Sequence, residues 1–234
     1  MNKKDKASPE LIGGLLKKGE TMLLTGPRFA GKSQLLIELA AAFATGADWI
    51  GRSCAKSRAF YVNLQLDGAS CTERFRAVFE KKGLAPENDS GLSMWHLRNY
   101  AGMMEELAPS LINMANGLHS DVIILDQMED VFSGNLWNEK DIQTFCRYLE
   151  RIRIETGAAV ICCATDPKIY PANAGLQDYR IGSDLFGPEG DCFLHLSPLG
   201  SFWRLEGERK DGLPFAVDLC YDWPLHAVAA GKEA

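Results

Sequence analysis

The chain has 234 residues, of which 46% are hydrophobic and 24% are charged, so it is long enough to bury the core of one domain. Its formal net charge of −6 argues against a broadly basic surface for nucleic acid, although it leaves room for a local basic loop. The seven cysteines form no C-x-x-C pair and no apolar run is long enough to cross a membrane, so we expect a soluble cytoplasmic protein with free thiols and no membrane contact.

The first strong signal along the chain is the short apolar run Thr21–Thr25, which predicts a buried strand. Residues 26–33 follow it and read Gly-Pro-Arg-Phe-Ala-Gly-Lys-Ser. This sequence matches the pattern G-x-x-x-x-G-K-[ST] of a phosphate-binding loop, or P-loop. Apolar residues at helical spacing come next and predict a helix that begins near Lys32.

The order strand, glycine loop, helix favours nucleotide binding over the alternative of an ordinary glycine-rich turn. The glycines let backbone N–H groups surround a phosphate, and the helix N-terminus adds a partial positive charge. We expect Lys32 to reach the β- and γ-phosphates and Ser33 to place its hydroxyl on Mg²⁺. The residues expected to contact the nucleotide are Gly26, Pro27, Arg28, Phe29, Ala30, Gly31, Lys32, Ser33 and Gln34.

The middle of the chain alternates apolar runs with amphipathic stretches, which is typical of a parallel sheet covered by helices on both faces. A capping box at residues 70–73 predicts the start of the second helix, which Gly83 ends, and Asn138 is expected to cap the fourth helix. The predicted strands are Ala59–Leu64, Leu92–Leu97, Val122–Asp126 and Ala158–Cys163, and the third helix runs from Met104 to Gly117.

One of these strands closes on a carboxylate, that of Asp126. A P-loop protein needs such a carboxylate at the end of a neighbouring strand, where it holds the Mg²⁺ ion and its water. The alternative is that Asp126 only caps the turn after the strand. Because the P-loop is present, we favour metal contact shared between Asp126 and Ser33.

The last third of the chain changes character. Residues 165–182 show little periodicity, and a structureless loop of this length is usually functional or mobile. Three short strands then follow, separated by turns rich in proline and glycine, and we expect them to extend the edge of the sheet in antiparallel fashion. These strands are Asp191–Ser197, Phe202–Arg209 and Phe215–Tyr221.

The whole pattern predicts an α/β fold with a mostly parallel central sheet, flanking helices and C-terminal antiparallel strands. We expect one domain at residues 9–228, a disordered N-terminal tail at 1–8 and a short C-terminal tail at 229–234. The tryptophans, Trp203 among them, are interpreted as packing residues rather than as platforms for a ligand.

Seven stretches occur in an order that matches one protein family. They are Gly14-Leu15-Leu16, the P-loop, Tyr61-Val62-Asn63-Leu64, Ile123-Ile124-Leu125-Asp126, Gly157-Ala158-Ala159-Val160, Gly182-Ser183 and Trp223-Pro224-Leu225-His226. From about residue 11 to 228, the chain resembles the RepA-like AAA ATPases of plasmids and mobile elements, which are RecA/DnaB-type P-loop proteins. The resemblance implies a RecA-like fold that binds ATP and Mg²⁺. It further implies a hexameric ring that hydrolyses ATP between subunits and moves along single-stranded DNA in replication.

The chain departs from this family at the residues of hydrolysis. The family's second strand ends in Asn-Leu-Glu, whose Glu is the general base for the attacking water, and this chain has Gln65 instead. A neutral amide orients a water but cannot accept its proton, and loss of a general base costs about 10²–10⁴-fold in rate. Asp67 is a candidate substitute and Glu129 a weaker one. The candidate catalytic residues are therefore Lys32, Gln65, Asp67 and Asp126.

The residues that sense the nucleotide in the family are altered as well. Where the family has a run of histidines followed by Ser-Lys, residues 164–168 of this chain keep only the lysine. The family's arginine after Gly-Ser is replaced within residues 186–189. Four cations remain as candidates for contact with the γ-phosphate or a neighbouring subunit, each equally open to interpretation as a solvated charge. They are Lys168, Arg180, Arg209 and Lys210.

Three functions are consistent with these observations. The first is an ATP-dependent motor on single-stranded DNA, which residues 165–182 would contact through Lys168, Arg180, Tyr170 and Tyr179. The second is an ATP-binding regulatory or assembly module that no longer hydrolyses ATP, an interpretation that Gln65 favours. The third, phosphoryl transfer to a small molecule, is the least favoured because the loop lacks an arginine-rich lid.

Overall fold

The computed structural model describes residues 8–84, 91–99, 101–135, 138–166, 190–210, 214–222 and 226–229. Nearly all of the two predicted tails lies outside the described residues. So does most of the loop at 165–182, with Lys168, Tyr170, Tyr179 and Arg180. None of the described helices is long and apolar enough to cross a membrane.

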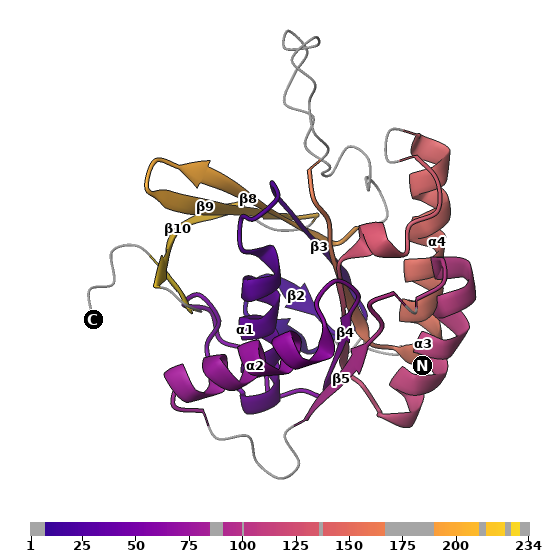
Figure 1. Ribbon diagram of the computed structural model, residues 1–234, viewed down its shortest axis with the longest axis horizontal. Coiled ribbons are helices and arrows are strands. Elements are labelled where there is room, and N and C mark those ends of the chain that lie inside the picture. Colours follow the sequence, from indigo (N-terminus) through magenta and orange to yellow (C-terminus); the bar gives the residue numbers. More distant parts are fainter. Residues whose placement is uncertain are drawn as a thin grey trace, which may run out of the picture.

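The described residues form a nine-stranded sheet with helices on both faces (Figure 1). Its strand order is β11-β10-β9-β8-β3-β7-β6-β4-β5. Within the run β8-β3-β7-β6-β4-β5 every neighbouring pair of strands is parallel, as the continuous apolar runs predicted. In chain order, the five strands of this sheet that come before β8 are β3 (Thr21–Thr25), β4 (Ala59–Asn63), β5 (Leu92–His96), β6 (Val122–Asp126) and β7 (Ala159–Cys163).

The C-terminal strands extend the edge of the sheet, as predicted; they lie on the side of β3, and a fourth strand that was not predicted follows the three expected ones. They are β8 (Cys192–Leu199), β9 (Phe202–Arg209), β10 (Phe215–Asp222) and β11 (His226–Ala229). From β8 to β11 each strand is antiparallel to the next, but β8 itself pairs with β3 in parallel. The antiparallel extension therefore begins at β9, one strand later than expected, and brings β8 directly beside the strand that carries the P-loop.

Two helices cover each face of the sheet (Figure 1). On one face lie α1 (Lys32–Thr45) and α2 (Gly68–Lys81), and on the other lie α3 (Met104–Gly117) and α4 (Glu139–Thr156). Side chains alternate along β3 between these two cores: Met22 and Leu24 pack with α1, whereas Leu23 packs with the α3 and α4 side. Helix α1 is apolar on nearly all sides because it is buried between the sheet, α2 and the C-terminal strands.

Two local features differ from the sequence-based expectation. The segment before β3 forms a small antiparallel hairpin of β1 (Glu10–Ile12) and β2 (Leu16–Lys17). Helix α2 begins at Gly68, and its N-cap is Asp67, whose carboxylate accepts the backbone N–H of Ser70. The predicted capping box at residues 70–73 is therefore wrong, because the helix already begins at Gly68 and the Asp67 carboxylate accepts a free N–H of its first turn.

Candidate functional site

The P-loop connects β3 to α1 at the carboxyl edge of the parallel strands (Figure 1). Two of its glycines lie in sterically restricted positions. Gly26 has a φ of 152°, and a Cβ there would lie 2.6 Å from the Leu196 carbonyl oxygen on β8. Gly31 has a φ of 88°, and a Cβ there would lie 2.5 Å from the Tyr221 ring on β10. Both positions therefore favour glycine: a Cβ at Gly26 would clash with the backbone of β8, and a Cβ at Gly31 would displace the Tyr221 side chain.

Lys32 lies at the first position of α1, with its side chain inside the loop. Its Nζ donates to the carbonyl oxygens of Gly26 and Pro27, at 2.8 Å each. Burial lowers the pKa of Lys32, and the nearby carboxylates of Asp126, Glu129 and Asp166 oppose this shift. The amine is thus held at the centre of the loop. A bound phosphate would replace the two carbonyl oxygens as its hydrogen-bond acceptor.

The structure brings Ser33 and Asp126 together at the carboxyl edge of the sheet, whereas their contact with Mg²⁺ stays a prediction. The Ser33 hydroxyl donates to Asp126 Oδ1 at 3.0 Å, and the Tyr61 hydroxyl donates to Asp126 Oδ2 at 2.6 Å. Asp126 is fully buried, and burial raises its pKa, although the hydrogen bonds from Tyr61 and Ser33 oppose the rise. A cation beside this carboxylate would therefore offset an unfavourable buried charge.

These residues fit a magnesium ion. A hydroxyl and a carboxylate are the hard oxygen donors that Mg²⁺ prefers, and the ion usually keeps waters and takes its remaining ligands from substrate phosphates. Ser33 and Asp126 would hold it, with Tyr61 fixing the orientation of the carboxylate from behind. The bound ion would neutralise phosphate charge there.

The P-loop lines a pocket of about 570 Å³, within the usual size range for a small-molecule site. Its walls join four regions of the sequence that lie far apart. They are the P-loop and start of α1 (Arg28, Phe29, Ala30, Gly31, Lys32, Ser33, Gln34), the segment β4–α2 (Gln65, Leu66, Arg74), the carboxyl ends of β6 and β7 (Gln127, Thr165) and the C-terminal strands (Trp203, Tyr221).

The candidate catalytic residues beyond the P-loop are placed differently from one another. Gln65 lines the pocket, where its amide can orient a water. Asp67 does not appear on the pocket wall, since its carboxylate caps α2, and the hydrogen bonds from Ser70 lower its pKa. The lower pKa makes Asp67 a weaker base, and its catalytic role remains a prediction.

Glu129 lies behind the pocket rather than in its wall. Its Oε1 accepts the backbone N–H of Thr165, and its buried Oε2 has no hydrogen-bond partner among the described residues. Burial raises the pKa of Glu129. The Thr165 hydroxyl in turn donates to Gln127 Oε1 at 2.9 Å, so Glu129 positions two polar side chains that line the pocket.

One of the candidate cations, Arg209, holds two parts of the fold together through its side chain. The Arg209 guanidinium donates to Glu20 at 2.9 Å and to the Leu15 carbonyl oxygen at 2.7 Å, which ties β9 to the chain before β3. Lys210 donates its backbone N–H to the Asp191 carbonyl oxygen. Neither side chain lines the pocket.

The sequence did not point to the aromatic wall of the pocket. Trp203 on β9, interpreted as a packing residue, lines the pocket, and so does Tyr221 on β10. The Tyr221 hydroxyl donates to the Ala30 carbonyl oxygen at 3.0 Å. No local sequence signal marks either residue, because the pairing of β8 with β3 that brings the C-terminal strands beside the loop joins segments far apart in the sequence.

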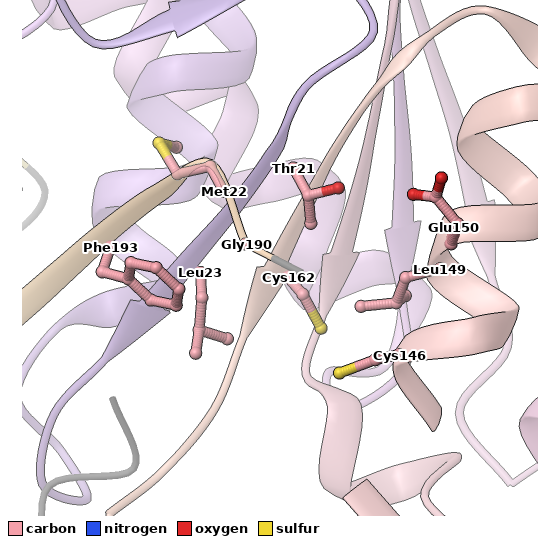
Figure 2. Close-up of a pocket in the computed structure, with 9 residues that line it drawn as sticks. All are labelled: Thr21, Met22, Leu23, Cys146, Leu149, Glu150, Cys162, Gly190 and Phe193. Atoms are coloured by element: carbon pink, nitrogen blue, oxygen red, sulfur yellow. The ribbon is translucent and has the colours of Figure 1, made fainter. Parts of the chain in front are cut away.

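A second, much smaller pocket lies between β3, β7 and α4 (Figure 2). The side chains of Cys146 and Cys162 point toward one another in it. Its volume of about 20 Å³ has room for about one water, so it cannot hold a nucleotide. Both cysteines are buried free thiols, as expected for Cys162, and burial holds the pKa of Cys162 well above its usual range, so they act as small apolar packing groups.

A family model described as "AAA domain" matches residues 2–164, which include the P-loop, Gln65 and Asp126. The chain belongs to this AAA domain family. The match ends just after β7, so the C-terminal strands that supply Trp203 and Tyr221 lie outside it. No curated protein sequence matches the chain.

Two solved structures illustrate the fold that this AAA domain shares. A KaiC-like protein, PH0186 of Pyrococcus horikoshii OT3, has a TM-score of 0.57 at 14% identity, with 94% of this chain and 93% of that chain covered. The flagellar accessory protein FlaH of Methanocaldococcus jannaschii has a TM-score of 0.58 at 13% identity, with 91% and 89% covered. At this identity the likeness concerns the fold, which is RecA-like, as predicted.

Proposed function

We propose that this AAA domain binds Mg·ATP in the pocket above the P-loop and hydrolyses it slowly. The observation that carries the proposal is the 3.0 Å contact between Ser33 and Asp126, which brings a hydroxyl and a buried carboxylate together beside the P-loop lysine. The triphosphate would lie along the loop, with Lys32 on its β- and γ-phosphates. Trp203 and Tyr221 would offer apolar rings to the base.

Slow hydrolysis follows from the polar groups near the phosphates. Gln65 and Gln127 line the pocket as neutral amides, and neither can accept a proton from water. Without a general base, the rate should be about 10²–10⁴-fold below that of an enzyme with one. Weak turnover that depends on the P-loop is therefore the expected behaviour.

A phosphate-release assay with three proteins tests this proposal. The wild-type chain should release phosphate slowly, and Lys32→Ala should abolish the release. Gln65→Glu should raise the rate, because the new carboxylate can accept the proton of the attacking water. Release that Lys32→Ala leaves unchanged would show that the activity arises elsewhere.

For the biological role, we propose a cytoplasmic RepA-like ATPase that serves replication or maintenance of a plasmid or mobile element. The ordered set of RepA-like stretches supports this role, which would require a ring of subunits, a hexamer by resemblance, and contact with single-stranded DNA through residues 165–182. Light scattering with and without Mg·ATPγS tests the ring. Fluorescence anisotropy with a labelled oligonucleotide at low salt tests the DNA contact, and absence of binding with and without ATP would exclude the motor.

The second candidate is an ATP-binding regulatory or assembly module that uses Mg·ATP as a conformational ligand. Gln65 favours it, because the site keeps its binding residues while the family's general base is missing. This module would bind nucleotide, remain monomeric and release no phosphate. Any release that Lys32→Ala abolishes would contradict it.

A further inference from the structure

A side chain at the end of β4 holds the loop that carries Gln65. Asn63 is the last residue of β4 and is buried. Its Oδ1 accepts the backbone N–H of Leu66 at 2.9 Å, and its Nδ2 donates to the Leu66 carbonyl oxygen at 2.7 Å. On the other side of Gln65, the backbone N–H of Leu64 donates to the Asp126 carbonyl oxygen at 2.8 Å. Gln65 therefore lies between two anchored neighbours.

The position of the Gln65 side chain depends on these anchors. Gln65 lines the pocket, and its amide forms no hydrogen bond within the described part of the chain. An amide that orients a water must be held in a fixed place beside the phosphates, because small misplacements of a catalytic group are costly in rate. The group that holds Leu66 therefore also determines how well Gln65 can act.

His96 contacts the amide that holds this loop. It is the last residue of β5 and lies directly beside Asn63 in the sheet. Its Nδ1 is 3.1 Å from Asn63 Nδ2. Its ring also packs against Gly68, the first residue of α2, where an added Cβ would lie 3.3 Å from the ring. His96 thus connects the end of β5 to both the Gln65 loop and the start of α2.

The geometry determines which form of the His96 ring can make this contact. The two bonds to Leu66 fix the orientation of the Asn63 amide, because a flipped amide would place donor against donor and acceptor against acceptor. The second N–H of Asn63 Nδ2 is therefore available to His96 Nδ1, which accepts it only when it carries no proton. The ring that fits is neutral, with its proton on Nε2. In an imidazolium, the Nδ1–H group would face the Asn63 N–H group, and the hydrogen bond would be lost.

The elements around His96 carry three charged side chains. Asp67 caps the N-terminus of α2, Arg98 follows β5, and Asp130 lies in the 3-10 helix Met128–Asp130. Arg98 lies within electrostatic reach of both carboxylates. The carboxylates favour a positive charge on the ring, whereas Arg98 and the positive end of α2 oppose it. Histidine is the side chain that ordinarily changes its charge between about pH 5 and pH 8.

We infer that His96 is a positioning residue for hydrolysis, whose neutral ring accepts a hydrogen bond from Asn63 and thereby holds Gln65 at the pocket. The inference rests on the proposed function, in which Gln65 orients the attacking water. Because an imidazolium cannot accept this hydrogen bond, the same contact makes turnover depend on pH. Protonation of His96 loosens the Gln65 loop and slows phosphate release.

Phosphate release at saturating Mg·ATP, measured from about pH 5.5 to about pH 8, tests the inference with four proteins. They are the wild-type chain, His96→Asn, His96→Phe and the matched control His119→Asn. The asparagine oxygen can replace Nδ1 as the acceptor and does not titrate, whereas phenylalanine keeps a ring but has no acceptor. His119 is exposed between α3 and β6 and has a φ of 52°, a backbone conformation that asparagine tolerates.

The expected rates separate positioning from nucleotide binding. At about pH 8, His96→Phe should release phosphate about 3- to 10-fold more slowly than the wild type, the usual effect of losing one hydrogen bond. Its affinity for Mg·ATPγS should not change, because Gln65 acts on the water, and His96→Asn should recover most of the lost rate. As the pH falls, the wild-type rate should fall relative to that of His96→Asn, whereas His119→Asn should keep the wild-type profile.

A wild-type rate in His96→Phe, or the same pH profile in His96→Asn and the wild type, would overturn the inference and leave the proposed function standing. A folded wild-type chain that releases no phosphate would instead overturn the proposed hydrolysis. Nuclear magnetic resonance of the wild-type chain with isotope-labelled histidine tests the contact itself, without turnover and without a variant that must fold. Near pH 8 the Nδ1 of His96 should be unprotonated and its Nε2 protonated, and the opposite tautomer would overturn the inference.

Discussion

Replacing Gly31 by alanine tests how closely the C-terminal strands pack on the P-loop. Gly31 precedes α1 with a φ of 88°, and a Cβ at this position would lie 2.5 Å from the Cζ and the hydroxyl oxygen of Tyr221. The substitution therefore carries two costs, a left-handed backbone at a residue with a side chain and a steric clash with an aromatic ring.

The structure separates these two costs through a second glycine. Gly157, after α4, has a φ of 66°, and an added Cβ there would meet no atom within 4 Å. Gly157→Ala should therefore lower the free energy of unfolding only by the backbone term, about 1–2 kcal/mol. Gly31→Ala should lose this amount plus about 1–3 kcal/mol for overpacking, or about 2–5 kcal/mol in all.

Urea unfolding followed by circular dichroism, without nucleotide, measures both variants. A double-mutant cycle with Tyr221→Ala isolates the clash: in that background Gly31→Ala should cost only the backbone term, giving a coupling energy of about 1–3 kcal/mol. Equal losses for Gly31→Ala and Gly157→Ala, together with additivity in the cycle, would refute the packing of Tyr221 on the loop.

Three further predictions concern the site. Tyr61→Phe should lower the free energy of unfolding in urea by about 1.5–3 kcal/mol, because Asp126 Oδ2 loses its donor in a fully buried place, and an unchanged midpoint would contradict this. Burial raises the pKa of Glu129, so the folded chain holds this proton to a higher pH than the unfolded chain, and the group's contribution to stability falls as pH rises from about 4.3 through the raised value. Glu129→Gln should remove this loss of stability. The urea midpoint of the variant should therefore rise relative to that of the wild type as pH increases. Parallel pH profiles of the two midpoints would contradict the prediction. Gln65→Glu should increase phosphate release about 10²-fold or more, and no increase would show that the missing general base does not limit the rate.

The parallel sheet and the P-loop could be predicted from the sequence, because each depends on a local pattern of residues. Thr21–Thr25 and Val122–Asp126 are apolar runs of strand length. The glycine pattern between β3 and α1 is specific to phosphate-binding loops when a strand precedes it and a helix follows it. The meeting of Ser33 with Asp126 could be predicted as well, since parallel strands present their carboxyl ends at one edge.

What the sequence did not reveal depends on contacts between distant segments. Trp203 and Tyr221 reach the pocket only because β8 returns beside β3, a pairing that no local pattern specifies. The start of α2 was misplaced because two capping signals lie within a few residues, and Asp67 prevails over the predicted box. Arg74 lines the pocket from α2. It was overlooked because the sequence pattern of this helix was used only to identify its hydrophobic residues.

The central claim is that a triphosphate binds along the P-loop, with its magnesium held by Ser33 and Asp126. Isothermal titration of ATPγS into the folded wild-type chain, with Mg²⁺ and with EDTA, tests this claim most directly, with Lys32→Ala as the control. The account predicts saturable heat that is strong with Mg²⁺, much weaker with EDTA and lost in Lys32→Ala. No heat from a well-folded wild-type sample, or equal binding by Lys32→Ala, would contradict it.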